Sequence, residues 1–290
     1  MNSILSQSDI EFFLNLINDA GAKALRMQRE AFDIHTKEDN SLVTDADLWV
    51  QGFLKEKISS RFKDYQFICE EDHPALRAPS TTPPFGHPSK EGNGGEFSDK
   101  VNFSDETVSV IIDPIDGTAM FTMCLPFWCI SIGIFKGYTP QYGFIFSPAS
   151  NLLFYNDDQS SYLNGKKLTA DPSIEIGKET NIFYSSEIKD LTINNFPGKI
   201  RNLGSTALHA ALAADNKRNR LLAFIGKSYL WDWAGAIPII QKAGVNLKYL
   251  NGTELDYKAI VENNFMLKDY AVAYNARDFG VIRGIFRRSE

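Results

Sequence analysis

The sequence predicts an α+β fold, because three kinds of pattern follow one another along the chain. Two amphipathic helical patterns come first, a run of aromatic and β-branched segments follows, and helices and strands then alternate. The 290 residues, 43% of them apolar, are enough for one large domain or two modest ones. A soft boundary near residue 156 is expected to divide the chain into an N-terminal α+β part, 1–156, and a C-terminal α/β part, 157–290.

Both N-terminal helices are predicted from the spacing of their apolar residues and from residues that can cap them. Residues 6–31 place apolar side chains three or four positions apart, with Ser or Asp at the start. A second helix follows the segment "LVTDAD" at 42–47, in which Thr44 can act as the N-terminal cap. The apolar face of this second helix is expected to carry Leu48, Phe53, Leu54 and Ile58.

Strands are predicted where short apolar or aromatic runs end at turn residues or acids. The runs 66–69 and 108–112 each stop at acidic residues, as strands do at a polar edge. Runs at 127–135, 141–147 and 152–155 form an antiparallel meander, which a turn at Asn164 and Gly165 closes. The later elements are expected in the order helix 205–214, strand 220–225, helix 232–243 ended by Gly244, strand 245–250 and strand 270–275.

Residues 74–105 differ in composition from the rest of the chain, because they are rich in proline and glycine and poor in large apolar residues. Such a composition predicts a flexible insertion. Two hypotheses stay open for it: a disordered insertion without function, or a flap over a nearby site.

Charge and cysteine content exclude several classes of protein. The net charge is −6 and no run of Lys or Arg occurs, so we expect no nucleic-acid partner. Cys69, Cys124 and Cys129 have no metal-binding spacing, and their odd number indicates reduced thiols. The charge-free stretch 117–135 is interrupted by proline and glycine, which favours a loop and a buried strand over a membrane span. With no secretory signal pattern at the start, these features predict a soluble, cytoplasmic protein without a membrane partner.

Acidic residues recur where predicted strands end or helices begin. They form four clusters: Asp45 with Asp47, Glu70 with Glu71 and Asp72, Asp113 with Asp116, and Asp232. Carboxylates placed after strands converge in α/β folds, and they would repel one another unless a divalent cation joined them. Oxygen ligands without His or Cys select a hard ion, so Mg²⁺ is expected first and Mn²⁺ second. The four histidines are scattered and offer no zinc site.

The segment "DPIDGT" at 113–118 has the features of a metal and phosphate site. Pro114 restricts the backbone between two aspartates, so a turn can present both carboxylates and the Ile115 carbonyl to one side. Gly117 and Thr118 then offer backbone N–H groups that can bind a phosphate oxygen. Metal-binding acids beside such N–H groups indicate phosphoryl chemistry assisted by two metal ions.

Three other interpretations of this segment fit it less well. An EF-hand loop starting at Asp113 would need an acid at Ile115 and a Glu at Cys124, so that motif is excluded. A phosphatase of the haloacid dehalogenase type needs two acids two positions apart, and Pro114 stands two positions before Asp116. A plain turn would explain the Asp, Pro and Gly residues but not the other acidic clusters.

Four segments together resemble the inositol monophosphatase superfamily: "KEDNSLVTDAD" (37–47), "EED" (70–72), "DPIDGT" (113–118) and "WDWAGAIPIIQKAG" (231–244). This superfamily contains Mg²⁺-dependent, lithium-sensitive phosphatases, among them inositol monophosphatases, fructose-1,6-bisphosphatases and 3′-phosphoadenosine 5′-phosphate phosphatases. The resemblance implies a layered α-β-α-β-α sandwich, commonly a homodimer. It also implies a phosphomonoesterase that acts on a small phosphorylated metabolite by attack of a metal-activated water.

The resemblance further implies roles for individual residues. Those expected to hold two or three Mg²⁺ ions are Glu70, Asp113, the Ile115 carbonyl, Asp116 and Asp232. Those expected to be catalytic are Glu70, Asp47 and Thr118, the last two by orienting and deprotonating the attacking water. The amides of Gly117 and Thr118 are expected to bind the phosphate. The resemblance also implies that five further residues support the site or bind the substrate: Glu71, Lys37, Gly204, Ser205 and Thr206.

Two departures from the family pattern leave the substrate open. Where the inositol branch has an acid that holds sugar hydroxyls, the segment 221–230 has none and offers Lys227, and Thr206 stands where alanine is common. Lys227 is either a solvated surface charge or a contact for a second anionic group. Inositol-type polyol phosphates remain the first candidate substrates, followed by 3′-phosphoadenosine 5′-phosphate, a sugar bisphosphate or histidinol phosphate. A non-catalytic, metal-binding relative is the alternative outside the enzymes.

Overall fold

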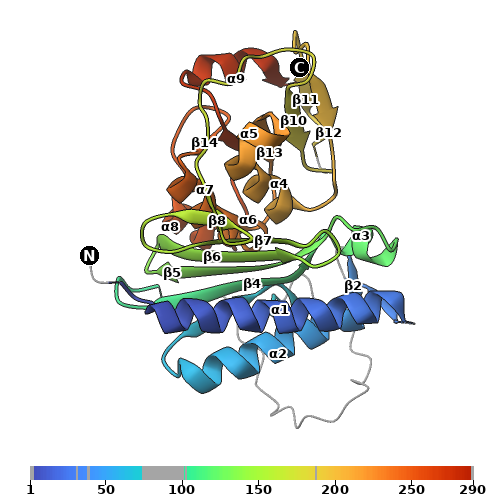
Figure 1. Ribbon diagram of the computed structural model, residues 1–290, viewed down its shortest axis with the longest axis vertical. Helices are drawn as coiled ribbons and strands as arrows, with labels where there is room; N and C mark the ends of the chain where they lie inside the picture. Colours follow the sequence, from blue (N-terminus) through green and yellow to red (C-terminus); the bar gives the residue numbers. More distant parts are fainter. Residues whose placement is uncertain are drawn as a thin grey trace.

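The computed structural model describes residues 3–30, 32–37, 40–73, 101, 103–186 and 188–288. Its layers follow one another along the long axis in Figure 1: a pair of helices, a sheet, a middle layer of helices, a second sheet and a last helix. The layered α-β-α-β-α sandwich expected from the sequence is therefore confirmed. Of the expected insertion 74–105, residues 74–100 and 102 lie outside the described residues, so both hypotheses for it stay open.

The first layer consists of α1 (Gln7–Arg29) and α2 (Asp45–Arg61), which cover one face of the first sheet (Figure 1). Both begin at the predicted caps, because Ser6 and Thr44 each form a reciprocal capping box with the third residue of the helix. The predicted apolar face of α2 is wrong at Leu48, which is 48% exposed. Leu48 precedes the buried Leu54 by six residues, which places it about 120° away around the helix axis.

The first sheet has the strand order β3-β4-β5-β6-β7-β8-β9. These strands are β3 (Gln66–Cys69), β4 (Val108–Asp116), β5 (Cys129–Lys136), β6 (Thr139–Ser147), β7 (Leu152–Asn156), β8 (Ser161–Leu163) and β9 (Lys166–Leu168). β3 pairs with β4 in parallel and each later pair is antiparallel, so the predicted meander is confirmed. The sheet continues through β8 and β9, past the boundary placed at residue 156, which stays a prediction.

The side chains of β4 alternate between two apolar clusters, one on each face of the first sheet. Val110 and Ile112 pack with Phe13 of α1 on one face. Ile111, between them in the chain, belongs with Trp233 to the cluster on the other face. Because both faces of β4 are covered, the acidic end of this strand lies inside the protein, between two layers of helices.

The middle layer contains α4 (Thr206–Leu212), α6 (Leu230–Ala234) and α7 (Ala236–Ala243). The helix predicted at 232–243 therefore begins at Leu230 and consists of two helices that meet at Gly235, and it ends at Gly244 as predicted. The sheet and these helices touch through glycines: a Cβ added to Gly143 would lie 1.9 Å from the Gly235 carbonyl oxygen. This close approach fixes α6, and with it Asp232, over the first sheet.

The second sheet has the strand order β12-β10-β13-β15-β14. Its strands are β10 (Asn181–Tyr184), β12 (Lys199–Arg201), β13 (Leu221–Gly226), β14 (Asn246–Tyr249) and β15 (Ala271–Tyr274). β10 runs parallel to both β12 and β13, so the carboxyl ends of these three strands lie on the same edge of the sheet. The outer face of this sheet packs against α9 (Phe279–Ile285) through Ile182, Leu222 and Ile282.

Several short elements were not predicted, because their patterns extend over too few residues to show a period. Besides β10, β12 and α9, they are β1 (Ile34–Thr36), β2 (Leu42–Thr44), a 3₁₀ turn (Glu70–Asp72), α3 (Thr118–Thr122), β11 (Leu191–Ile193), a 3₁₀ turn (Ala213–Asp215), α5 (Asn216–Asn219), α8 (Tyr257–Glu262) and β16 (Phe286–Arg288). Within the described ranges, none of the helices is both long and apolar enough to cross a membrane.

Replacing Gly143 by Ala should destabilise the fold by about 1–3 kcal/mol, because the added methyl group would overlap the Gly235 carbonyl and push the helix layer off the sheet. Gly52→Ala is the matched control: it lies in α2, where a Cβ meets nothing within 4 Å, and alanine favours a helix over glycine by about 0.5–1 kcal/mol. Urea unfolding measures both changes. If the Gly143 variant were as stable as the wild type, the close contact would not constrain the fold.

Candidate active site

Three carboxylates meet between the end of β4 and the first turn of α6. Oxygens of Asp113, Asp116 and Asp232 all lie within 4.8 Å of one another. Asp113 and Asp116 are three positions apart, so a regular strand would turn them to opposite faces. An extra residue between them shifts the register, since Asp113 pairs with Ser131 but Asp116 pairs with Cys129. This bulge brings both carboxylates to the side of the sheet on which Asp232 lies.

Burial raises the pKa of all three carboxyl groups. Burial, and next the charge of Glu70, raises the pKa of Asp113 well above its usual range. Burial also raises the pKa of Asp232, and the charge of Asp116 adds to the effect. Oδ1 of Asp113 is buried and has no hydrogen-bond partner among the described residues. Three ionised carboxylates in this position are therefore unfavourable unless a positive species lies among their oxygens.

Asp116 differs from the other two because a loop of donors holds it. Ser205 Oγ donates to its carboxylate at 2.5 Å, the Ala207 amide at 2.5 Å and the Thr206 amide at 3.2 Å. Burial raises the pKa of Asp116 and these donors oppose the rise, so that its pKa is about 6. Ser205 and Thr206 of the predicted substrate loop, together with Ala207, thus fix the position of this aspartate.

Lys37 lies between two further acids and has no exposed side-chain surface. Its Nζ is 2.7 Å from Oε1 of Glu70 and 2.7 Å from Oε1 of Glu71. Burial alone would lower the pKa of Lys37, but the two carboxylates outweigh it and raise the pKa above its usual value. Burial raises the pKa of Glu71 to about 9. Lys37 follows β1, so this contact ties the β1–β2 hairpin to the acids.

Asp47 and Thr118 form a pair beside the carboxylates. Thr44 holds one oxygen of Asp47 through its amide at 2.8 Å and its hydroxyl at 2.5 Å. The Thr118 hydroxyl is 3.1 Å from the Ile115 carbonyl oxygen and 3.4 Å from the other oxygen of Asp47. Burial raises the pKa of Asp47 to about 7, although the Thr44 hydrogen bonds oppose it. A carboxyl group with this pKa can exchange a proton near neutral pH.

A cavity of about 210 Å³ lies beside the acids. The predicted site residues that line it are Glu70, Gly204, Ser205, Thr206, Lys227 and Asp232. The cavity therefore brings together residues from α6, the 3₁₀ turn after β3, the segment after β13 and the loop that leads into α4. Gly117 lies against this loop, because a Cβ added there would be 3.1 Å from the Gly204 carbonyl oxygen.

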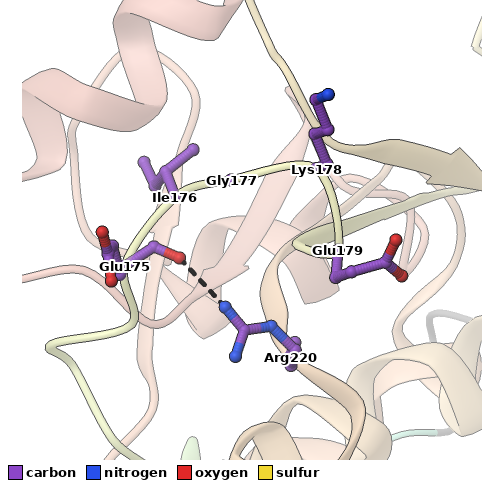
Figure 2. Close-up of a pocket in the computed structure, with 6 residues that line it drawn as sticks. All are labelled: Glu175, Ile176, Gly177, Lys178, Glu179 and Arg220. Atoms are coloured by element: carbon purple, nitrogen blue, oxygen red, sulfur yellow. Dashed lines mark hydrogen bonds between the residues drawn. The ribbon is translucent and has the colours of Figure 1, made fainter.

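A larger groove, of about 400 Å³, lies elsewhere and is not the candidate site. Figure 2 shows its lining, in which Arg220 donates a hydrogen bond to the Glu175 carbonyl at 3.4 Å. Arg220 precedes β13, whereas Lys227 follows it, so the groove and the acid-lined cavity lie at opposite ends of this strand. The described residues that line the groove include none of the three clustered aspartates. Chemistry, and not size, therefore identifies the site.

The sequence did not indicate three polar residues of the acid-lined cavity: Ser185, Asn202 and His209. Nε2 of His209 accepts a hydrogen bond from the Leu203 amide at 2.7 Å, so the neutral ring carries its proton on Nδ1. Burial lowers the pKa of His209 to about 3. The ring thus supports the loop that holds Asp116, a role that a scattered histidine in a sequence does not signal.

The donor set fits a hard divalent cation. It consists of oxygens from three aspartates, one of which has an unpartnered, buried Oδ1, and the charge of Glu70 acts on the same group. The nearest thiol is that of Cys129, 3.9 Å from Asp116 Oδ2. Burial raises the pKa of Cys129 well above its usual value, so this thiol stays protonated and is a poor ligand for a soft metal.

Comparison with known proteins agrees with this chemistry. A family model described as "Inositol monophosphatase family" matches residues 6–276, and the chain belongs to this family. It is 29% identical over 280 residues to inositol monophosphatase 3 of Solanum lycopersicum, with 90% of this chain and 95% of that protein covered. It is 26% identical over 248 residues to a histidinol-phosphatase of Chlorobaculum parvum, with 81% and 83% covered. The structure of a Thermotoga maritima IMPase has the same fold, with a TM-score of 0.73, 20% identity and 96% of each chain covered.

Members of this family are metal-dependent phosphatases, so the chain is a phosphoric monoester hydrolase. The two relatives carry the names of enzymes with different substrates. Membership in the family therefore establishes the type of reaction but not the ester that this chain hydrolyses.

Asp113→Asn should stabilise the metal-free protein by about 1–3 kcal/mol, because it removes a buried acid that lies among like charges. Asp116→Asn is the matched comparison and should destabilise it by about 1–3 kcal/mol, since one amide NH₂ would face the donors of the 205–207 loop. Urea unfolding in EDTA measures both effects. Added Mg²⁺ should stabilise the wild type but not the Asp113 variant, and equal destabilisation by both substitutions would contradict this account.

The stability of the protein should fall in acid partly because of His209. The unfolded chain protonates this histidine below a pKa of 6.5, whereas the folded protein does so only near 3, so stability is lost as the pH falls between these values. Between pH 7 and pH 5 the loss from this group is about 2 kcal/mol. His209→Gln keeps an acceptor for Leu203 and should remove this part of the pH dependence in urea unfolding. An unchanged pH dependence would show that His209 titrates normally in the folded protein.

Proposed function

We propose that this phosphatase is a Mg²⁺-dependent phosphomonoesterase that hydrolyses a small polyol phosphate of the inositol type by direct attack of water. The observation that carries the proposal is the meeting of Asp113, Asp116 and Asp232 beside the Thr118–Asp47 pair. Such a site combines ligands for hard cations with a proton acceptor, which is what phosphate ester hydrolysis requires.

The proposed ligands fall into two overlapping sets. Glu70, Asp113 and the Ile115 carbonyl would hold one Mg²⁺, and Asp113, Asp116 and Asp232 a second, with Glu70 contributing to a third. Bound Mg²⁺ would polarise the phosphate and lower the pKa of water, and Mn²⁺ is a possible substitute. The orphaned Oδ1 of Asp113 supports this assignment, because a buried carboxylate oxygen without a donor suits a cation.

Thr118 and Asp47 are proposed to take the proton of the attacking water. The Thr118 hydroxyl hydrogen points to one of two acceptors, Ile115 O at 3.1 Å or Asp47 Oδ1 at 3.4 Å, which leaves its oxygen free to accept from water. As the water oxygen bonds to phosphorus, its proton passes through Thr118 to Asp47. The bond between phosphorus and the ester oxygen breaks, and the leaving oxygen takes a proton from solvent.

The phosphate is proposed to lie against the first turn of α3. Gly117 adopts φ +94°, a conformation that favours glycine, and the first N–H groups of a helix have no partner within it. The Gly117 and Thr118 amides can therefore donate to the phosphate oxygens. Glu71 and Lys37 would position Glu70, and Gly204, Ser205 and Thr206 would position Asp116 beside the substrate.

Histidinol phosphate, a sugar bisphosphate and 3′-phosphoadenosine 5′-phosphate remain alternative substrates. The similarity to a histidinol-phosphatase supports keeping the first of these. A homodimeric assembly and inhibition by lithium are further proposals that rest on the family likeness alone. A cytoplasmic location is a proposal that rests on the sequence features described above. Sizing of the purified protein by light scattering tests the assembly, and a monomer at micromolar concentration would exclude it.

Phosphate release should depend on Mg²⁺, stop in EDTA and be abolished by Asp116→Asn. A suitable panel contains inositol 1-phosphate, glycerol 2-phosphate, fructose 1,6-bisphosphate, 3′-phosphoadenosine 5′-phosphate and histidinol phosphate. Thr118→Val should lower kcat by about 10²–10⁴-fold, the usual contribution of proton transfer, whereas Thr118→Ser keeps the hydroxyl and should retain most activity. Equal activity of the Val and Ser variants would remove Thr118 from the mechanism, and turnover in EDTA would exclude the metal-dependent reaction.

A further inference from the structure

The acid-lined cavity has a second wall, which comes from the second sheet. β12, β10 and β13 are neighbouring parallel strands, and the residues that follow their carboxyl ends are Asn202, Ser185 with Ser186, and Lys227. All of these line the cavity, as do Glu70 and Asp232. Ligands of α/β proteins commonly bind at the carboxyl ends of parallel strands.

The two walls differ in charge. Glu70 and Asp232 belong to the acidic wall, whereas Lys227 is the one formally charged cation among the described residues that line the cavity. His209, also in the lining, is neutral because burial lowers its pKa to about 3. The described lining of the cavity therefore contains carboxylates and one cation, and this cation follows β13, whereas the carboxylates belong to α6 and the turn after β3.

The described residues that follow β10 and β12, which are Ser185, Ser186 and Asn202, offer hydrogen-bond donors to the cavity that Lys227 lines. Asn202 is fixed by two hydrogen bonds, from its amide to Ser186 Oγ at 3.0 Å and from the Gly204 amide to its oxygen at 2.7 Å. Ser185 Oγ is buried and has no hydrogen-bond partner among the described residues. Asp190 is a described acid on which the charge of Lys227 acts. A hydrogen bond from Tyr270, and to a smaller extent the charge of Lys227, lower the pKa of Asp190. In the described part of the chain, Lys227 forms no ion pair.

We propose that the Lys227 wall binds a second anionic group on the alcohol part of the substrate. The inference rests on the proposed hydrolysis at the acidic wall, which it leaves unchanged. In place of singly anionic polyol phosphates, it favours phosphate esters whose alcohol carries a second phosphate or a carboxylate. The acidic wall would hold Mg²⁺, which would bind the reacting phosphate, and Lys227 would attract the second anion on the alcohol part of the ester. A cavity of about 210 Å³ suits an alcohol of a few carbon atoms.

Paired substrates test the proposal in the Mg²⁺-loaded enzyme. One pair is 3-phosphoglycerate and glycerol 3-phosphate, which differ by a carboxylate. The other is fructose 1,6-bisphosphate and fructose 1-phosphate, which differ by a phosphate. We expect kcat/KM to be higher for the doubly anionic member of at least one pair, and the pair concerned shows which anion is recognised.

Lys227→Met should lower kcat/KM for the preferred doubly anionic ester by about 10-fold, mainly through KM, because a partly exposed charged contact is lost. Turnover of the singly anionic partner should change by less than about 2-fold, which also shows that the variant is folded. Lys227→Arg should keep the preference. Lys178→Met is the matched control, since Lys178 lines the unrelated groove of Figure 2 and should affect neither ester.

Two failures can be told apart. If the wild type releases phosphate from no ester with Mg²⁺, the proposed function itself fails. If it hydrolyses the singly anionic esters as well as the doubly anionic ones, or if Lys227→Met lowers both members of a pair equally, the hydrolysis stands and the Lys227 subsite is wrong.

Discussion

The repulsion among three neighbouring carboxylates is the constraint on which the rest of this structure depends. Asp113, Asp116 and Asp232 present oxygens within 4.8 Å of one another, and burial raises the pKa of each. A fold without a function would replace such residues, because unpaired buried charge costs stability. The surrounding residues compensate this cost to different extents for Asp116 and Asp113. Asp116 accepts hydrogen bonds from Ser205, Thr206 and Ala207, whereas Oδ1 of Asp113 has no partner among the described residues, so the least compensated oxygen lies where a cation is most strongly favoured.

The architecture serves to hold these acids from two directions. Asp113 and Asp116 belong to the first sheet and lie at a bulge of β4, which is covered on both faces. The middle helices deliver Asp232, and their distance from the sheet is set by backbone contact at Gly143 and Gly133. Because packed interiors resist small displacements, the close contact between the sheet and the helices also fixes the positions of the three aspartates. The layers of Figure 1 thus place the site at the junction of the first sheet with the middle helices.

The sequence could predict those features that depend on residues close to one another in the chain. The caps of α1 and α2 lie within four residues of the groups they bind, and the pattern of β4 continues directly into its acids. What it could not predict depends on contacts between distant segments. His209 supports the site because the Leu203 amide, in the loop before α4, donates a hydrogen bond to its ring. Ser185 and Asn202 line the cavity because β10 and β12, which precede them, end beside β13. The division of the middle helix at Gly235 is likewise visible only once the sheet lies against it.

In the proposed function, different parts of the chain carry out the chemistry and select the substrate. The proposed metal ligands lie on β4, α6 and the turn after β3, where motifs of a few residues specify them. The residues that follow β10, β12 and β13 and line the same cavity are not among the proposed metal ligands. According to the proposal, a substitution at Lys227 would act on the binding of the alcohol part of the ester and not on the metal ligands. This separation gives a physical reason why one family contains proteins named for inositol phosphates and for histidinol phosphate, and why the identity of the Lys227 wall, more than overall similarity, should decide the substrate.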